Sequence, residues 1–302
     1  MRNKKALMII SVFLSAVFVF ANVPYGSPDF AEAAVVMPQA GGSKVFSNKK
    51  AAIDASNISD GYVMVKYADG SSSTRLKVII EGPGSSKYTY DLAQSGAFEV
   101  FPFTAGDGKY KVSVYQNTSG TKYASLLSES VDVKLKDQFA PFIIPNQYVN
   151  YKSDSKVVLK AAELVSGKTE VLDKTAAIYN FVVDNFTYDK QKAATVKSGY
   201  IPDVDAILAS KTGICFDYAA VMSAMLRSNA VPTKLVIGYA GTVYHAWISV
   251  YSSKEGWIEN VIYFDGKTWK LMDPTFASGG KSSDSIMQYI GNGSNYSAKY
   301  YY

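Results

Sequence analysis

Hydrophobic and polar residues alternate with a period of two along the first half of the chain. The alternating segments, from about Lys44 to Lys136, are rich in Val, Ile, Tyr and Phe, which favour strands. They are Tyr62–Tyr67, Arg75–Glu81, Lys87–Leu92, Ala97–Phe103, Lys109–Gln116 and Tyr123–Leu135. Turn sequences such as Asp69-Gly70 separate them. Short strands at roughly 8–12-residue spacing predict an all-β sandwich over residues 44–137.

One segment of this predicted sandwich suggests its type. The residues from Gly108 to Tyr115 alternate cleanly and resemble a late strand of an immunoglobulin-like domain. Residues 44–137 contain no nucleophile paired with a base, because the single Cys and the single His of the chain both lie later. We therefore expect a spacer or ligand-binding module of immunoglobulin-like type.

The pattern changes after residues 138–154, a connector that contains Pro141 and Pro145. Apolar residues recur at helical spacing, and then two alternating segments follow. The predicted elements are helices over Ser155–Val165, Glu170–Phe186, Asp203–Ala209 and Cys215–Ser228, strands over Lys234–Tyr239 and Tyr244–Tyr251, and a hairpin that turns at Asp265-Gly266. Helices followed by antiparallel strands predict an α+β domain over residues 155–302.

The N-terminal residues have the pattern of an export signal. Arg2, Lys4 and Lys5 precede an uncharged, mostly apolar stretch from Ala6 to Ala21, which is short for a membrane span of about 20 residues. Ala31-Glu32-Ala33 fits a cleavage site, and Val19-Phe20-Ala21 is a nearer alternative. We expect residues 1–33 to be a signal peptide, residues 34–43 a linker, and the mature protein to be secreted or at the cell surface without a transmembrane segment. An uncleaved membrane anchor is the alternative.

Composition narrows the possible chemistry. The 302 residues are 48% hydrophobic and carry a net charge of +5, from 31 Lys and Arg against 26 Asp and Glu. The basic residues do not cluster in long runs, so we expect no nucleic-acid partner. One Cys and one His exclude an intrachain disulfide and a Cys/His zinc site, and we expect no metal and no cofactor.

Cys215 is the residue that most needs an explanation. It follows Thr212-Gly213-Ile214 and begins a long apolar run that predicts a buried helix. The backbone N–H groups and the dipole at a helix N-terminus favour a thiolate over a thiol. A buried structural cysteine is the alternative for such a residue taken alone.

His245 and Asp273 supply the other groups of a possible catalytic triad. His245 lies on a predicted strand, with Trp247 and Ser249 on the same face, and Asp273 precedes Pro274 at a strand end. Thiol acyl transfer needs a base for the thiol proton and a carboxylate that orients the imidazole. Each residue also has a structural interpretation, a packed strand histidine and an Asp-Pro turn.

Three ordered blocks of the sequence resemble the transglutaminase-like superfamily of papain-like fold. The first is Gly213-Ile214-Cys215-Phe216-Asp217-Tyr218-Ala219, which continues to Arg227 and Pro232. The second is the segment from Val236 to Tyr239 followed by His245-Ala246-Trp247. The third is Trp269 with Asp273-Pro274-Thr275. The resemblance covers roughly Lys174–Phe276.

The resemblance implies both a fold and a reaction. It implies a papain-like transglutaminase core with Cys215 as nucleophile, His245 as base and Asp273 as the orienting acid. The Cys215 backbone N–H, and Tyr188 as a second donor, are candidates for the oxyanion hole. The substrate would be a protein or peptide amide, with the cell wall as one location, and the acceptor either an amine or water. A catalytically inert cell-surface or cell-wall binding module of the same fold is the alternative.

Overall fold

The structure is a computed structural model. It describes residues 35–68, 74–93, 95–259, 262–264, 269–271 and 296–302, of which 262–264 and 269–271 are described by their backbone alone. The predicted signal peptide, the Asp265-Gly266 turn and Asp273 lie outside the described residues. Among the described residues, no helix is both long and apolar enough to cross a membrane.

The first half of the described chain forms two four-stranded antiparallel sheets. One has the order β1-β2-β3-β6 and the other β5-β4-β7-β8. The strands are β1 (Val45–Ser47), β2 (Ala51–Asp54), β3 (Tyr62–Tyr67), β4 (Leu76–Glu81), β5 (Lys87–Leu92), β6 (Glu99–Pro102), β7 (Gly108–Ser119) and β8 (Lys122–Val133). The predicted strands are confirmed, and β1 and β2 are additions to the prediction. Short 3-10 turns lie at Ile58–Asp60, Pro83–Ser85 and Ala140–Phe142.

The two sheets share an apolar core. Leu76, Val78 and Ile80 of β4 are buried and alternate with half-buried residues, as a strand with one covered face requires. Rings from the first sheet pack on rings of the second, with centroids 5.0 Å apart for Phe101 and Tyr90. The antiparallel sheets that were predicted before the helical region are therefore present. Their immunoglobulin-like type remains a prediction.

Helices dominate the next part of the chain. They are α1 (Lys156–Val165), α2 (Val171–Asn185), α3 (Lys190–Thr195), α4 (Val204–Ser210) and α5 (Cys215–Arg227). Every residue of α5 from Asp217 onward is buried, because α1, α2 and α4 pack against this helix and strands β11 (Thr233–Ala240) and β12 (Val243–Ser252) also contact it. The helix that begins at Cys215 is therefore the centre of this half.

A third antiparallel sheet completes the α+β half. Its order is β13-β12-β11-β16, with β13 (Gly256–Ile258) and β16 (Tyr296–Tyr301) at the edges. Two short pairs accompany it. The strands β9 (Thr187–Tyr188) and β10 (Thr212–Gly213) are parallel, whereas β14 (Ile262–Phe264) and β15 (Trp269–Leu271) pair antiparallel, as the hairpin prediction required.

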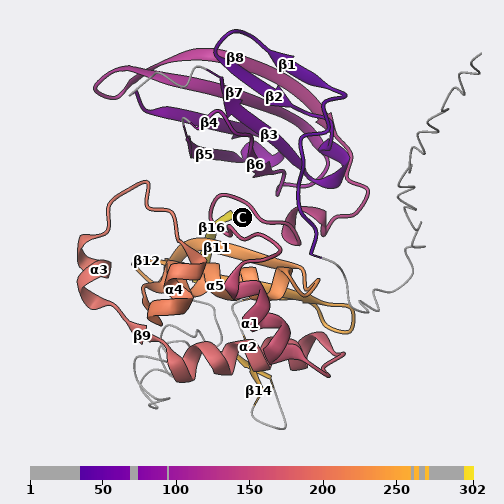
Figure 1. Cartoon of the computed structure of the whole chain (residues 1–302), viewed down its shortest axis with the longest axis vertical. Coiled ribbons are helices and arrows are strands. Elements are labelled where there is room, and N and C mark those ends of the chain that lie inside the picture. The colour runs from indigo at the N-terminus through magenta and orange to yellow at the C-terminus, as the bar shows by residue number, and fades with distance from the viewer. Residues whose placement is uncertain (1–34, 69–73, 94, 260–261, 265–268, 272–295) are drawn as a thin grey trace, which may run out of the picture.

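The C-terminal strand lies between the two halves of the molecule (Figure 1). Tyr302 exchanges main-chain hydrogen bonds with Leu235 of β11. Its ring packs edge-on against Tyr88 and Tyr90 of β5 and against Tyr148 of the connector, at centroid distances of 5.5, 5.8 and 4.7 Å. The β half and the helical half therefore contact each other through tyrosine rings. The predicted domain boundaries at 44–137, 138–154 and 155–302 remain predictions.

Candidate functional site around Cys215

Cys215 is the first residue of α5, as the sequence predicted, and its thiol is partly exposed and free. The turn before it is tight because Gly213 lies against the helix. A Cβ atom on Gly213 would come within 2.6 Å of the Asp217 Cβ. The pairing of β10 with β9 holds this turn from the other side, and the Asp189 N–H donates to the Gly213 carbonyl at 2.9 Å. The backbone at the nucleophile candidate is thus fixed on two sides.

The position at the helix start also determines the electrostatics of the thiol. The first N–H groups of a helix have no partner within the helix and carry the positive end of its dipole. Such groups can stabilise a negative charge that forms on a substrate oxygen beside the start of α5. Tyr188, the second oxyanion candidate, pairs with Gly213 through its backbone, and its ring packs on Tyr218 at 6.4 Å.

Asp217, two residues after Cys215, is completely buried in the first turn of α5. One carboxylate oxygen accepts from the Ile214 N–H at 2.8 Å, the hydrogen bond by which a residue at this position caps a helix. The same oxygen accepts from the Lys192 amine at 2.6 Å, and the other accepts from the Tyr200 hydroxyl at 2.5 Å. Asp217 therefore connects the turn before Cys215 to a distant part of the chain.

His245 lies in β12, where the sequence placed it, and is only 5% exposed. Its ring is stacked with that of Trp247 and packs edge-on against that of Tyr296, with ring centroids 6.2 Å apart in both pairs. The contact between His245 and Trp247 agrees with their predicted position on one face of the strand. Aromatic packing limits the orientations that the imidazole can adopt.

The helix that begins at Cys215 and the strand that carries His245 pack on each other. Phe216 packs on Tyr148 at a centroid distance of 5.4 Å. Burial raises the pKa of Tyr244, the residue before His245, and the charges of Tyr300, Tyr239 and Cys215 raise it further.

Sequence reasoning missed two residues of this arrangement, Lys192 and Tyr200. Asp217 was visible in the sequence as part of the first block, and its spacing from Ile214 is a helix-capping pattern. No local pattern connects Lys192 or Tyr200 with Asp217, because the contacts are made across 25 and 17 residues of sequence. Only the folded chain reveals them.

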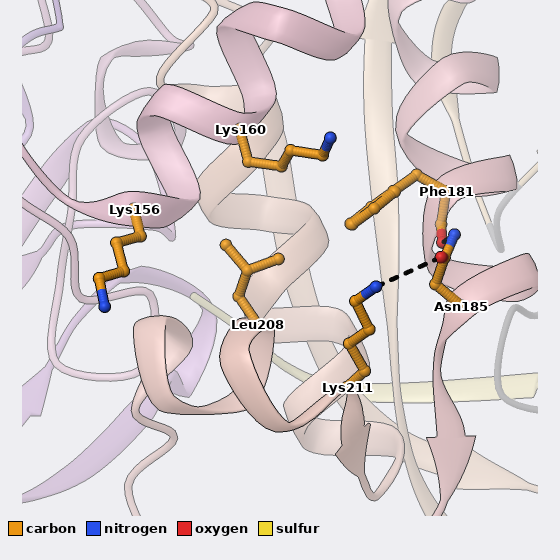
Figure 2. A pocket seen from close by; sticks show the side chains of 6 residues that line it. All are labelled: Lys156, Lys160, Phe181, Asn185, Leu208 and Lys211. Atoms are coloured by element: carbon orange, nitrogen blue, oxygen red, sulfur yellow. Dashed lines mark hydrogen bonds between the residues drawn. The ribbon is translucent and has the colours of Figure 1, made fainter.

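A separate pocket of about 530 Å³ lies on α1, α2 and α4 (Figure 2). It is lined by Lys156, Lys160, Phe181, Asn185, Leu208 and Lys211. The Lys211 amine points across it toward the Asn185 side-chain oxygen, at 3.5 Å. None of the predicted catalytic residues lines this pocket. Within the described part of the chain, His, Cys, Asp and Glu side chains form no group of three that could hold a metal ion.

Comparison with known proteins identifies the part of the chain that contains Cys215 and His245. Residues 160–261 match the family model of the transglutaminase-like superfamily. This part of the chain is a transglutaminase-like core. The resemblance that the sequence blocks suggested is thereby confirmed. The matched residues begin before Lys174 and end before Asp273, so the third block lies beyond them.

The chain is similar to three further proteins. The uncharacterized protein YebA of Bacillus subtilis (strain 168) is 24% identical over 153 residues, which are 44% of this chain and 21% of YebA; the match thus spans about a fifth of that protein. A Cytophaga hutchinsonii protein provisionally assigned as a cysteine protease is 18% identical, with a TM-score of 0.36 over 77% of this chain and 68% of that one. Red sea bream transglutaminase is 14% identical, with a TM-score of 0.32 over 88% and 56%.

Proposed function

We propose that the protein is an exported cysteine enzyme of the transglutaminase-like class that acts on a protein or peptide amide. Cys215 is the nucleophile, His245 the base, and Asp273 the carboxylate that orients the imidazole. The observation that carries the proposal is the position of the only thiol of the chain at the start of a buried helix in a transglutaminase-like core. That helix packs on the strand of the only histidine.

The reaction follows from these groups. His245 takes the thiol proton, and the Cys215 sulfur attacks the carbonyl carbon of the amide. The tetrahedral oxyanion accepts a hydrogen bond from the Cys215 N–H, with Tyr188 as a second donor. When the C–N bond breaks, His245 gives the proton to the leaving amine, and a thioester remains on Cys215. Water or an amine then gives a proton to His245 and attacks the thioester carbonyl carbon. The C–S bond breaks, the proton returns to the Cys215 sulfur, and a carboxylic acid or a new amide leaves.

Residues 1–33 act as a signal peptide, and the mature protein works outside the cell, with cell-wall protein or peptide as one substrate. The sheets β1–β8 form an immunoglobulin-like sandwich that serves as a spacer or binding module. The tyrosine contacts between Tyr302 and β5 support a fixed placement of this module on the core.

Turnover in the presence and absence of an amine acceptor tests the proposal. Wild type, Cys215→Ala and the control Ser223→Ala are incubated with a peptide library and with or without a small primary amine. Ser223 is buried in the same helix, so its variant reports damage to α5 that does not involve the thiol. We expect Cys215→Ala to lose at least about a thousandfold in turnover and Ser223→Ala to keep its activity. Equal turnover in wild type and Cys215→Ala would reject the enzyme.

The same experiment separates the two acceptors and the inert alternative. Amine incorporation identifies a cross-linking enzyme, whereas hydrolysis that the amine does not divert identifies a protease or amidase. A binding module would show no turnover in any variant. Its Cys215 would also react with iodoacetamide only after denaturation, whereas an activated thiolate reacts well below pH 8.5.

A further inference from the structure

The segment from Lys190 to Tyr200 is attached to the protein by few side chains. Helix α3 and the residues after it are exposed, with two exceptions, Lys192 and Tyr200. Only 27% of the Lys192 side chain is accessible, although lysine usually extends into water. The segment contains no buried apolar residue, so apolar burial does not explain why it folds against the core.

Both shielded residues bond the same buried group. The Lys192 amine lies 2.6 Å from one oxygen of Asp217, and the Tyr200 hydroxyl donates to the other at 2.5 Å. The Lys192 amine also donates to the Tyr200 hydroxyl at 2.7 Å and lies 4.3 Å from the ring centroid. The Tyr200 ring meets Phe216, the neighbour of Cys215, at 6.2 Å. Asp217 is therefore where this segment joins the core.

Asp217 is a completely buried carboxylate in the first turn of the helix that begins at Cys215. A buried carboxylate without a compensating cation would oppose any negative charge that forms near it. The Lys192 cation compensates the charge of Asp217, and the Tyr200 hydroxyl disperses it further. The compensated carboxylate keeps its cap on the Ile214 N–H and holds the first turn of α5 in place.

We propose that Lys192 and Tyr200 are positioning residues that act through Asp217 to keep Cys215 in a reactive geometry and charge state. This inference rests on the proposed function. Among the described residues, other titratable groups on segments that contact the start of α5 or the rest of this helix include Tyr244 and His245 on β12, Tyr188 on β9 and Tyr148 of the connector. Substitutions at Lys192 and Tyr200 leave all four in place.

The pH dependence of Cys215 alkylation tests the inference on the full chain. Iodoacetamide rates are measured for wild type, Lys192→Met, Lys192→Arg and Tyr200→Phe, together with the control Lys190→Met. Lys190 is exposed on the same short helix, so its variant removes the same charge without touching Asp217. Peptide turnover and thermal unfolding are measured in parallel.

We expect the alkylation midpoint of Lys192→Met to rise by about one pH unit and its kcat to fall about tenfold with little change in KM. Lys192→Arg keeps a cation at this position, so its alkylation midpoint should stay within about 0.3 pH units of wild type. The midpoint of Lys190→Met should equal that of wild type. Tyr200→Phe shifts the midpoint in the same direction by a smaller amount.

An alkylation midpoint of Lys192→Met equal to that of wild type would overturn the inference. This holds even if the variant unfolds at a lower temperature, since the role of Lys192 would then be structural alone. If Lys192→Met does not fold, Tyr200→Phe decides by the same criterion, because it keeps the ring against Phe216. If the wild-type protein itself shows an alkylation midpoint of about 8.5, the value of a free thiol, the proposed function is rejected instead. The two failures are therefore distinguishable.

Discussion

The Lys192 amine lies 2.6 Å from a carboxylate oxygen of Asp217, across 25 residues of sequence. The contact joins an exposed short helix to the first turn of the central helix α5. It also places a cation beside the buried carboxylate that is two residues from Cys215. The local environment of the thiol therefore depends on a surface segment as well as on the helix itself.

Gly213→Ala is expected to damage both stability and activity. Its Cβ would lie 2.6 Å from the Asp217 Cβ, so the turn must move away from the helix that begins at Cys215. We expect a loss of about 1–3 kcal/mol in the free energy of unfolding and at least a tenfold loss of turnover. Urea titration and peptide turnover measure the two effects.

Gly120→Ala is the control for that experiment. Gly120 lies in the β7–β8 hairpin with φ +52°, a backbone conformation that a side chain makes less favourable. A Cβ atom on Gly120 would have no atom from beyond its chain neighbours within 4 Å, so the substitution causes no steric clash. We expect lower stability with unchanged turnover per folded molecule. Unchanged turnover in Gly213→Ala as well would contradict the role of the tight turn.

Arg227→Met is expected to destabilise the protein strongly. The guanidinium is buried at the end of α5 and donates to the carbonyls of Thr233, Ile144 and Tyr302. Burial lowers the pKa of Arg227 to about 10. Removal of the guanidinium takes these donors away from buried oxygens, of which only the Tyr302 oxygen keeps a described second donor, the Leu235 N–H. We expect a cost of about 3 kcal/mol or more in unfolding free energy.

Urea unfolding measures this cost, with Arg75→Met as the matched control. Arg75 donates to the Gly120 carbonyl at an exposed site, where a loss below about 1 kcal/mol is expected. Similar losses in the two variants would show that Arg227 does not hold the connector, β11 and the C-terminal strand together.

Glu99→Gln is expected to change the pH dependence of stability. Burial raises the pKa of Glu99 above 4.5, although hydrogen bonds from the Ala93 N–H and Gln147 lower it. The folded state therefore binds the Glu99 proton more tightly than the unfolded state. The corresponding stability is present below pH 4.5 and is lost as the pH rises through the raised pKa.

Thermal unfolding between about pH 4 and pH 7 measures the difference. Glu99→Gln should unfold at a higher temperature than wild type at pH 7, and the two should converge at the acidic end. Glu81→Gln removes a charge from an exposed site and serves as the control. A difference that does not vary with pH would contradict the assignment.

Asp273→Asn tests the third residue of the proposed triad, which lies outside the described residues. If Asp273 orients the imidazole of His245, its amide variant should lower turnover by about 10²–10⁴-fold without changing the fold. Asp265→Asn, in the predicted hairpin turn, is the control and should remain active. Equal activity in the two variants would remove Asp273 from the site.

The sequence predicted those elements that have a regular burial pattern. Strand β3 matches its predicted range because its ends are marked by turns, and α5 begins at Cys215 as predicted. Strand β2 was missed because all four of its residues are buried, which removes the alternation. Helix α3, with the sequence KQKAAT, was missed because it has no apolar face.

The residues of the candidate site could be predicted from the sequence, but the contacts between them could not. With one Cys and one His in the chain, the order of the sequence blocks was enough to select Cys215 and His245. The packing of α5 on β12, by contrast, is a tertiary contact between distant segments. The same holds for Lys192, whose contact with Asp217 leaves no local trace in the sequence.

Intact-mass analysis of the quenched reaction tests the central claim most directly, because that claim is a thioester on Cys215. Wild type, Cys215→Ala and His245→Asn are mixed with a peptide amide that the wild type turns over, and the reaction is stopped with acid within the first turnover. We predict that wild type gains the mass of the acyl fragment, and that digestion of the quenched protein locates this mass on the segment that contains Cys215. Cys215→Ala should gain none, and His245→Asn should gain it far more slowly. An acyl-enzyme that persists in Cys215→Ala, or turnover by the wild type without any acylated Cys215, would contradict the account.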